Sequence, residues 1–123
     1  MATVLLYNIK KEKAAKLKML CRSFFIEAKD VEKADYGKTL SFLLGESDDP
    51  HSESGADFDD EMLYLADVNP SFLGVFLDQL KRKKLTVALK AVKTETNAGF
   101  SSYRLRDELC AEREAMSQGK TAH

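Results

Sequence analysis

The residues best suited to binding a ligand lie in the run Lys93-Thr94-Glu95-Thr96-Asn97, directly after the last predicted strand. Hydroxyl, amide and ammonium groups can bind an anion, and a helix that begins just beyond them adds positive potential at its N-terminus. In α/β proteins, ligands commonly bind outside the carboxyl ends of strands. The spacing therefore predicts a ligand-binding edge here without identifying the ligand.

Polar residues also follow the other predicted strands. If all the strands run in one direction, these residues gather at the same edge of the sheet. A small anion is the ligand best suited to that edge. The predicted ligand-binding residues are Asn8, Asp67, Asn69, Lys93, Thr94, Thr96 and Asn97, with Asp30 at the same edge. Helix capping and turn formation are the structural alternative for each of them.

The sequence offers few residues that are suited to acid–base or nucleophilic catalysis. His51 lies in an acidic segment and His123 is the last residue, so neither is expected to be held rigidly. Cys21 and Cys110 fall in predicted helices, where buried thiols usually act as small hydrophobic groups. We therefore predict no catalytic residue and favour a protein that is not an enzyme. The alternative is a minor enzyme acting on a phosphorylated or nucleotide-like metabolite.

Sequence signatures of cofactor and metal sites are absent. Neither G-x-x-x-x-G-K-[ST] nor G-x-G-x-x-G occurs, and Gly37-Lys38-Thr39 lacks the preceding glycine of a P-loop. The cysteines and His51 lack zinc spacing, and the acidic segment lacks the calcium pattern D-x-[DN]-x-[DN]-G. The sequence predicts neither a cofactor nor a bound metal.

Strands and helices alternate along the chain. Continuous apolar runs predict strands, and apolar residues at helical spacing predict amphipathic helices. The predicted strands are Thr3–Asn8, Phe24–Val31, Glu61–Ala66 and Thr86–Val92. The predicted helices are Lys11–Arg22, Tyr36–Leu44 with Gly45 at its end, one that begins at Asn69-Pro70 and closes with Lys81–Lys84, and one capped by Ser101.

This alternation predicts an α/β fold: a four-stranded, mainly parallel sheet in the order 2-1-3-4 with helices on both faces. The alternative is a ferredoxin-like α+β sandwich, in which Tyr36–Leu44 is an excursion between antiparallel strands. The length of 123 residues suits one domain, predicted over residues 1–118 and followed by a disordered tail over 119–123. No internal repeat is evident in the sequence.

Charge is strongly segregated. The segment Glu46–Glu61 holds eight of the 20 acidic residues and no Lys or Arg. The rest of the chain therefore has 12 acidic and 19 basic residues. Ser, Gly and Pro within this segment predict a flexible acidic loop over residues 46–60. We expect it to be solvated.

Two basic groups, Lys10–Lys18 and Lys81–Lys84, fit outer helix faces and a helix C-terminus. No aromatic residue alternates with them, so nucleic-acid binding is not expected. No apolar run approaches the roughly 20 residues that span a bilayer, and the start of the sequence lacks a secretory signal. These features predict a soluble, cytoplasmic protein without a membrane contact. A homodimer through a sheet edge or helix face is the alternative partner.

The second half of the chain resembles a known bacterial family, the domain of unknown function 3783. The resemblance rests on EMLYLADV, the helix containing LDQL, LKAVKTETN and the final amphipathic helix, and less sharply on KKEKAAKLKMLC and DYGKTLSFLLG. Glu95 stands where the family pattern has Pro. The resemblance implies a small bacterial cytosolic protein and brings no assigned activity. We therefore predict a non-enzymatic ligand-binding or regulatory module, with a protein–protein interaction module as a further alternative.

Overall fold

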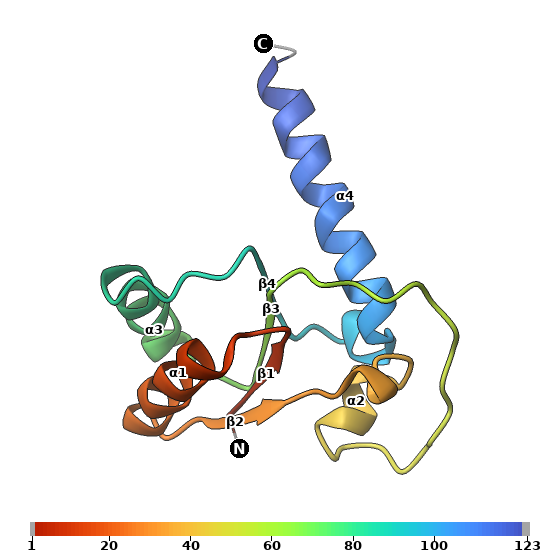
Figure 1. Cartoon of the computed structure of the whole chain (residues 1–123), viewed down its shortest axis with the longest axis horizontal. Coiled ribbons are helices and arrows are strands. Elements are labelled where there is room, and N and C mark those ends of the chain that lie inside the picture. The colour runs from red at the N-terminus through yellow and green to blue at the C-terminus, as the bar shows by residue number, and fades with distance from the viewer. Residues whose placement is uncertain (1, 122–123) are drawn as a thin grey trace. The chain divides into compact units, whose positions relative to one another are not determined.

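A computed structural model describes the backbone of residues 2–121 and the side chains of residues 2–116. The strands are β1 (Thr3–Tyr7), β2 (Glu27–Asp30), β3 (Met62–Ala66) and β4 (Leu89–Val92) (Figure 1). The helices are α1 (Lys11–Ser23), α2 (Leu40–Leu43), α3 (Pro70–Arg82) and α4 (Ser102–Thr121), with 3₁₀ helices η1 (Lys33–Asp35) and η2 (Asn97–Gly99).

These elements form two compact units. Unit 1 comprises Met1–Glu32 and Asp59–Lys93 and holds the four strands, α1 and α3. Unit 2 comprises Lys33–Phe58 and Thr94–His123 and holds the remaining helices. The single domain over residues 1–118 stays a prediction. The predicted tail over 119–123 overlaps the end of α4, and its last two residues lie outside the described part of the chain.

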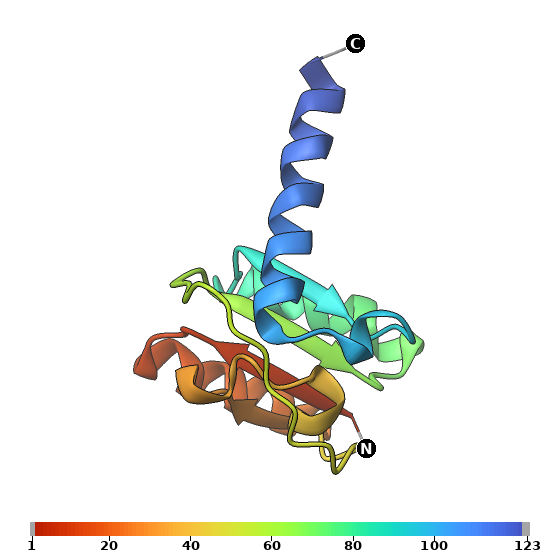
Figure 2. The same ribbon diagram turned by 90° about the vertical axis from the view of Figure 1, so that its right-hand side faces the viewer.

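The sheet of unit 1 has the predicted strand order, β2-β1-β3-β4 (Figure 2). β1 pairs with β2 in parallel, and β3 pairs with β4 in parallel, so the mainly parallel α/β fold is confirmed and the ferredoxin-like alternative is not needed. The central pair β1–β3 is antiparallel, with Thr3 opposite Ala66 and Tyr7 opposite Met62. The expectation that all the strands run in one direction is therefore wrong.

One face of the sheet packs against both α1 and α3 (Figure 1). Alternate residues of the central strands point to this face, as the two-residue period of a strand requires. The buried cluster consists of Val4, Leu6, Leu63 and Leu65 from the sheet, Ala14, Leu17, Leu20 and Cys21 from α1, Phe76 and Leu80 from α3, and Ile26, Leu85 and Val87 after the helices. The large side chains that alternate with them on the central strands are also buried.

Unit 1 contains a structural repeat that the sequence does not reveal. The first strand and the helix after it are five and 13 residues long in both β1-α1-β2 and β3-α3-β4, and equivalent residues lie 59 positions apart. The antiparallel register preserves this symmetry, since exchanging the repeats turns the pair Thr3–Ala66 into the pair Met62–Tyr7. Over residues 3–26 and 62–85 only Leu6 and Leu65 are identical, which explains why no repeat was expected.

Both long helices of unit 1 end in the same turn. Ile26 N–H donates to the Cys21 carbonyl at 2.9 Å, and the equivalent Leu85 N–H donates to the Leu80 carbonyl at 2.8 Å. This is the Schellman arrangement, in which the residue before the last donor adopts a left-handed backbone. That residue is Phe25 in one repeat and Lys84 in the other, with φ of 59° and 58°. The predicted strand Phe24–Val31 therefore begins only at Glu27, because its first residues close α1.

Unit 2 combines the short helices η1, α2 and η2 with the 20-residue α4. The predicted helix Tyr36–Leu44 divides into η1 and the four-residue α2, with Thr39 capping α2 and Gly45 ending it at φ 79°. Ser101 caps α4 as predicted, since its Oγ accepts from Arg104 N–H at 3.1 Å. Strand-like pairing joins the two N-caps, because Thr39 forms an isolated antiparallel bridge with Ser101.

The acidic segment has no helix or strand between α2 and β3, yet unit 2 holds it at several points. Glu53 N–H donates to the Gly37 carbonyl at 3.0 Å, and Ser101 Oγ donates to Glu53 Oε1. Phe58 is buried and stacks on Tyr36, with 4.8 Å between the ring centroids. The Ser-, Gly- and Asp-rich composition did not reveal these contacts.

Candidate functional site

The predicted ligand-binding residues do not share one edge of the sheet. Asn8 follows β1 at the edge where β3 begins, and its side-chain amide donates to the Asp60 carbonyl at 3.0 Å. Asp67 follows β3 at the opposite edge, beside the start of β1. Within unit 1, the antiparallel β1–β3 pair therefore separates Asn8 and Asp30 from Asp67, Asn69 and Lys93, which follow β3 and β4.

Three predicted residues remain together in unit 1, after β3 and β4. Lys93 Nζ lies 3.5 Å from Asp67 Oδ1, and Asn69 Oδ1 accepts from Ser71 N–H at 2.9 Å. The second bond is the predicted helix cap, and Pro70 occupies the first turn as expected. The ion pair and the cap account for these side chains without a ligand. Their role in ligand binding stays a prediction.

The last three predicted residues belong to unit 2. Asn97 Oδ1 accepts from Thr94 N–H at 2.8 Å, and Thr94 Oγ1 accepts from Asn97 N–H at 3.0 Å. Thr96 precedes η2, and its side chain makes no capping hydrogen bond to that helix. The reciprocal bonds of Thr94 and Asn97 close a local turn, which is the structural alternative anticipated for them.

The described residues among those considered for catalysis do not form a reactive group. Burial raises the pKa of the Cys21 thiol to about 11, so the nucleophilic thiolate is disfavoured at neutral pH. His51 is exposed, with its backbone N–H bonded to Asp49 Oδ1 at 3.0 Å. His123 lies outside the described residues. Among the described residues, no three His, Cys, Asp or Glu side chains are grouped so as to hold a metal ion.

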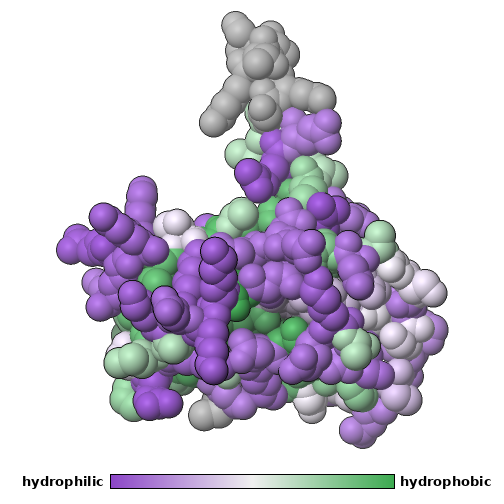
Figure 3. Space-filling view, in the orientation of Figure 1, coloured by the Kyte–Doolittle hydropathy of each residue, from purple (hydrophilic) through white to green (hydrophobic). Residues whose placement is uncertain are grey.

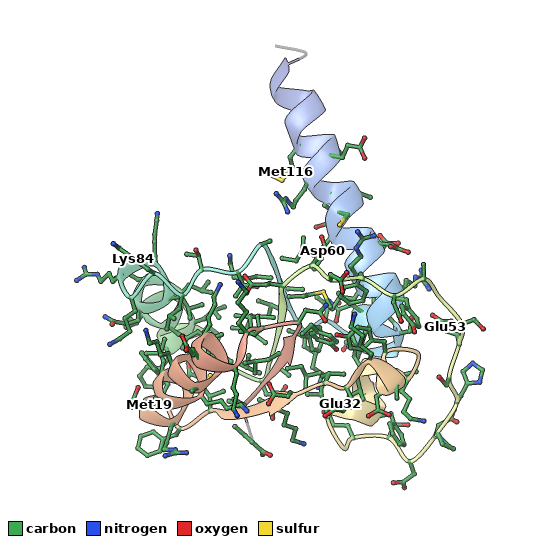
Figure 4. The ribbon with its side chains drawn as sticks, in the orientation of Figure 1. Met19, Glu32, Glu53, Asp60, Lys84 and Met116 are labelled. Carbon is green, nitrogen blue, oxygen red and sulfur yellow. The ribbon has the colours of Figure 1, made fainter. Side chains whose placement is uncertain are left out.

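A hollow of about 390 Å³ lies between α1 and the residues that follow α3. We call it the α1–α3 hollow; it is lined by Lys16, Met19, Leu20, Ser23, Lys83 and Leu85. Leu20 and Leu85 are buried and form an apolar floor. Met19 of α1 (Figure 4) borders it and is 69% exposed. Its size falls within the range of small-ligand and side-chain pockets.

The two helices beside the hollow are antiparallel neighbours. Near the start of α1, Lys13 Nζ donates to the Thr86 carbonyl at 2.7 Å, just beyond the end of α3. Near the end of α1, the Phe24 ring packs edge-on against Phe76, with 5.5 Å between centroids. The hollow therefore lies along a packed helix pair and is held by core residues of unit 1.

The helix pair is strongly basic. Residues 10–25 and 69–85 carry ten Lys or Arg side chains and two acidic ones. Lys13 pairs with Glu61 at 2.8 Å, and Lys18 pairs with Asp30. No described residue forms an ion pair with Lys16 or Lys83, the two lysines that line the hollow. Their charges favour an anionic group at this position.

Large apolar side chains are exposed on the same helix pair. Four of the six in the described part of the chain lie here: Met19, Phe25, Phe72 and Val75. Phe25 is 89% exposed and has a left-handed backbone, which is unfavourable for a bulky side chain. Figure 3 shows hydrophobic side chains among hydrophilic ones over α1. The exposure and the backbone strain together mark this surface for contact with another molecule.

Sequence reasoning missed this surface. Met19 is a large apolar residue of α1 that lies off the buried stripe, and that mismatch could have indicated an exposed binding surface. Phe25 was assigned to a strand, where an aromatic residue needs no special explanation. Lys83 was explained by the helix dipole alone. The hollow itself depends on which side of α3 neighbours α1, and local patterns do not contain that information.

Comparison with known proteins gives one match. Residues 61–116 match the family model of the domain of unknown function DUF3783. No curated protein and no solved structure is similar to the chain. No described helix has the length and apolar character needed to cross a membrane. The match covers β3, α3, β4, η2 and much of α4, and it confirms for residues 61–116 the predicted resemblance to DUF3783.

Proposed function

We propose that this protein is a non-enzymatic binding module and that it contacts its partner through the outer surface of α1 and α3. The observation that carries the proposal is Phe25, a large aromatic side chain that is 89% exposed on a left-handed backbone. A glycine would suit that backbone better, and the exposed ring packs against little within the chain. A binding role explains why such a residue stands there.

Other properties of the helix pair support the same role. The α1–α3 hollow has an apolar floor, and Met19 beside it offers a flexible side chain of the kind used at adaptable binding surfaces. An enzyme is less well supported, because the candidate residues within the described part of the chain form neither a nucleophile–base pair nor an acid–base pair. Among the predicted anion-binding residues, the Asp67–Lys93 ion pair, the Asn69 cap and the Thr94–Asn97 turn account for five side chains without a ligand.

The proposal is tested by selecting peptide ligands for the full chain from a random display library. We expect the selected peptides to shift amide NMR signals of α1, α3 and residues 24–26. We also expect binding to fall about tenfold in Met19→Ala/Phe25→Gly, since two exposed anchors are removed. Met116→Ala is the matched control, because Met116 is 67% exposed on α4.

Two results would overturn the proposal. One is a footprint centred on Asp67 and Lys93 rather than on the helix pair, which would restore the sheet-edge site. The other is a selection that yields no ligand dependent on Met19 or Phe25.

A further inference from the structure

One pair of equivalent positions in the two repeats of unit 1, Phe24 and Lys83, bears on the α1–α3 hollow. Phe24 and Lys83 each follow a helix, and their backbones are alike, with φ/ψ of −104°/10° and −87°/4°. Phe24 is partly buried and packs its ring on Phe76 of the neighbouring helix. The residue of α1 equivalent to Phe76 is Leu17, and no aromatic ring from position 83 packs over it.

The hollow lies where that missing ring would be. Lys16 and Leu20, one position before and three positions after Leu17, both line it, as does Lys83 itself. In the other repeat, the chain's own Phe24 stands at the position equivalent to Lys83, and its ring packs on Phe76. The same backbone position therefore carries a packed aromatic ring in one repeat and a lysine beside a hollow in the other.

From this asymmetry we infer that the hollow binds an aromatic side chain on an acidic peptide segment of a partner protein, with Lys16 and Lys83 contacting carboxylates beside the ring. This inference rests on the proposed function and specifies its ligand. Apolar floor residues suit the ring, and the two lysines, which pair with no described residue, suit the flanking negative charges. Exposed Met19 and Phe25 extend the apolar surface beyond one ring, which favours a peptide over a small molecule.

The chain's own acidic aromatic sequence does not fit this role. Asp57-Phe58-Asp59 has the required composition, but Phe58 is 5% exposed and stacked on Tyr36. Its ring is therefore not available to a second copy of the chain. Nucleic acid is also disfavoured, because none of the described residues that line the hollow is aromatic and able to stack on bases.

The test uses the full chain and a fluorescein-labelled peptide with one phenylalanine flanked on each side by two aspartates. We expect binding by fluorescence polarisation that weakens about tenfold when the peptide phenylalanine becomes alanine, as for loss of one buried anchor. Replacing the aspartates by asparagines should also weaken binding and remove most of its salt dependence. A single-stranded oligothymidylate should not compete.

Variants of the chain locate the site. Lys83→Phe should fill the hollow with the chain's own ring and lower peptide affinity about tenfold or more, whereas Lys83→Gln, which leaves the hollow open, should lower it less. Lys84→Phe is the matched control: it removes the same charge from the adjacent residue, which does not line the hollow, and should retain most of the affinity.

Several outcomes would overturn the inference: no binding up to millimolar peptide, equal affinity for the alanine peptide, unchanged affinity in Lys83→Phe, or displacement by oligothymidylate. A library-selected peptide that still contacts α1 and α3 without an aromatic residue or acidic flanks would refute this ligand class. The proposed binding function would then remain supported.

Discussion

Comparison of β1-α1-β2 with β3-α3-β4 shows which features the two repeats share through their common backbone and which features depend on individual side chains. Both repeats bury apolar residues at equivalent positions, with Leu17 matching Phe76 and Cys21 matching Leu80. Both have a left-handed residue after the first strand and another after the helix. Nearly all these residue types differ between the repeats. The shared backbone thus follows from the spacing and burial of apolar residues. The side-chain differences place Lys83 beside the hollow, the titratable Cys21 in the core of the first repeat, and a side-chain N-cap on α3 but not on α1.

Two single substitutions, each of which introduces the residue found at the equivalent position of the other repeat, should have the largest effect on stability. Phe24→Lys removes a partly buried ring and its contact with Phe76, so we expect a loss of about 3 kcal/mol in the free energy of unfolding. Lys83→Phe should raise that free energy by about 1 kcal/mol, since a ring enters an apolar hollow. Urea denaturation measures both, and destabilisation by Lys83→Phe would show that the two niches are not equivalent.

The buried thiol should make the first repeat sensitive to alkaline pH. Burial raises the pKa of Cys21 from 9.0 to about 11, so the folded state keeps its proton where the unfolded state releases it. The resulting contribution to stability is complete below pH 9 and is lost as pH rises towards 11, by about 2 kcal/mol.

The Cys21→Ala variant separates this contribution from other alkaline titrations. Relative to the parent chain at each pH, its free energy of unfolding should lack the decline between pH 9 and 11. Equal declines in the two proteins would remove Cys21 as the cause. At pH 8, alkylation followed by mass spectrometry should modify Cys110, which is only partly buried, well before Cys21.

Glycine substitutions at Phe25 and Lys84, the two residues with a left-handed backbone after the helices, should change stability alike and binding differently. Phe25→Gly and Lys84→Gly each relieve an unfavourable backbone at an exposed side chain, so each should stabilise the fold by about 1 kcal/mol. Thermal and urea unfolding measure the effect. We expect only Phe25→Gly to weaken binding of ligands selected against the helix pair. Destabilisation by Phe25→Gly would mean that its ring stabilises the fold.

Alanine substitutions at the N-caps of α1 and α3 should show the smallest difference in stability among these comparisons. Asn69 caps α3 through its side chain, whereas the equivalent Lys10 makes no side-chain cap on α1. Asn69→Ala should therefore lower stability by about 1 kcal/mol, and Lys10→Ala should leave it nearly unchanged. Equal losses in urea denaturation would indicate that the cap hydrogen bond contributes little.

Local patterns were sufficient to predict the order of the sheet and most helices. Apolar runs located β1 and β3, and Asn69-Pro70 located the start of α3. The reversal of β3 relative to β1 could not be predicted, because the long segment between β2 and β3 permits either direction. The predicted strand at Phe24–Val31 was too long because apolar residues that close a helix look like the start of a strand.

The candidate site was less predictable than the fold. Thr94 and Asn97 were correctly recognised as able to form a turn, and their reciprocal bonds do so. Lys83, which lines the α1–α3 hollow, stands at the position where the other repeat has the packed ring of Phe24, and this difference becomes visible only when the repeats are compared in space. With one identical residue between them, sequence comparison alone does not align the repeats.

The most direct test of the proposed site is methyl NMR of the full chain labelled at the methionine methyl groups. Adding the phenylalanine–aspartate peptide should shift the Met19 methyl signal upfield through the ring current, while Met62, which is buried, and Met116 on α4 act as internal references. The alanine peptide should give no such shift. An unmoved Met19 signal at saturating peptide, or the same change with both peptides, would contradict aromatic binding in the hollow.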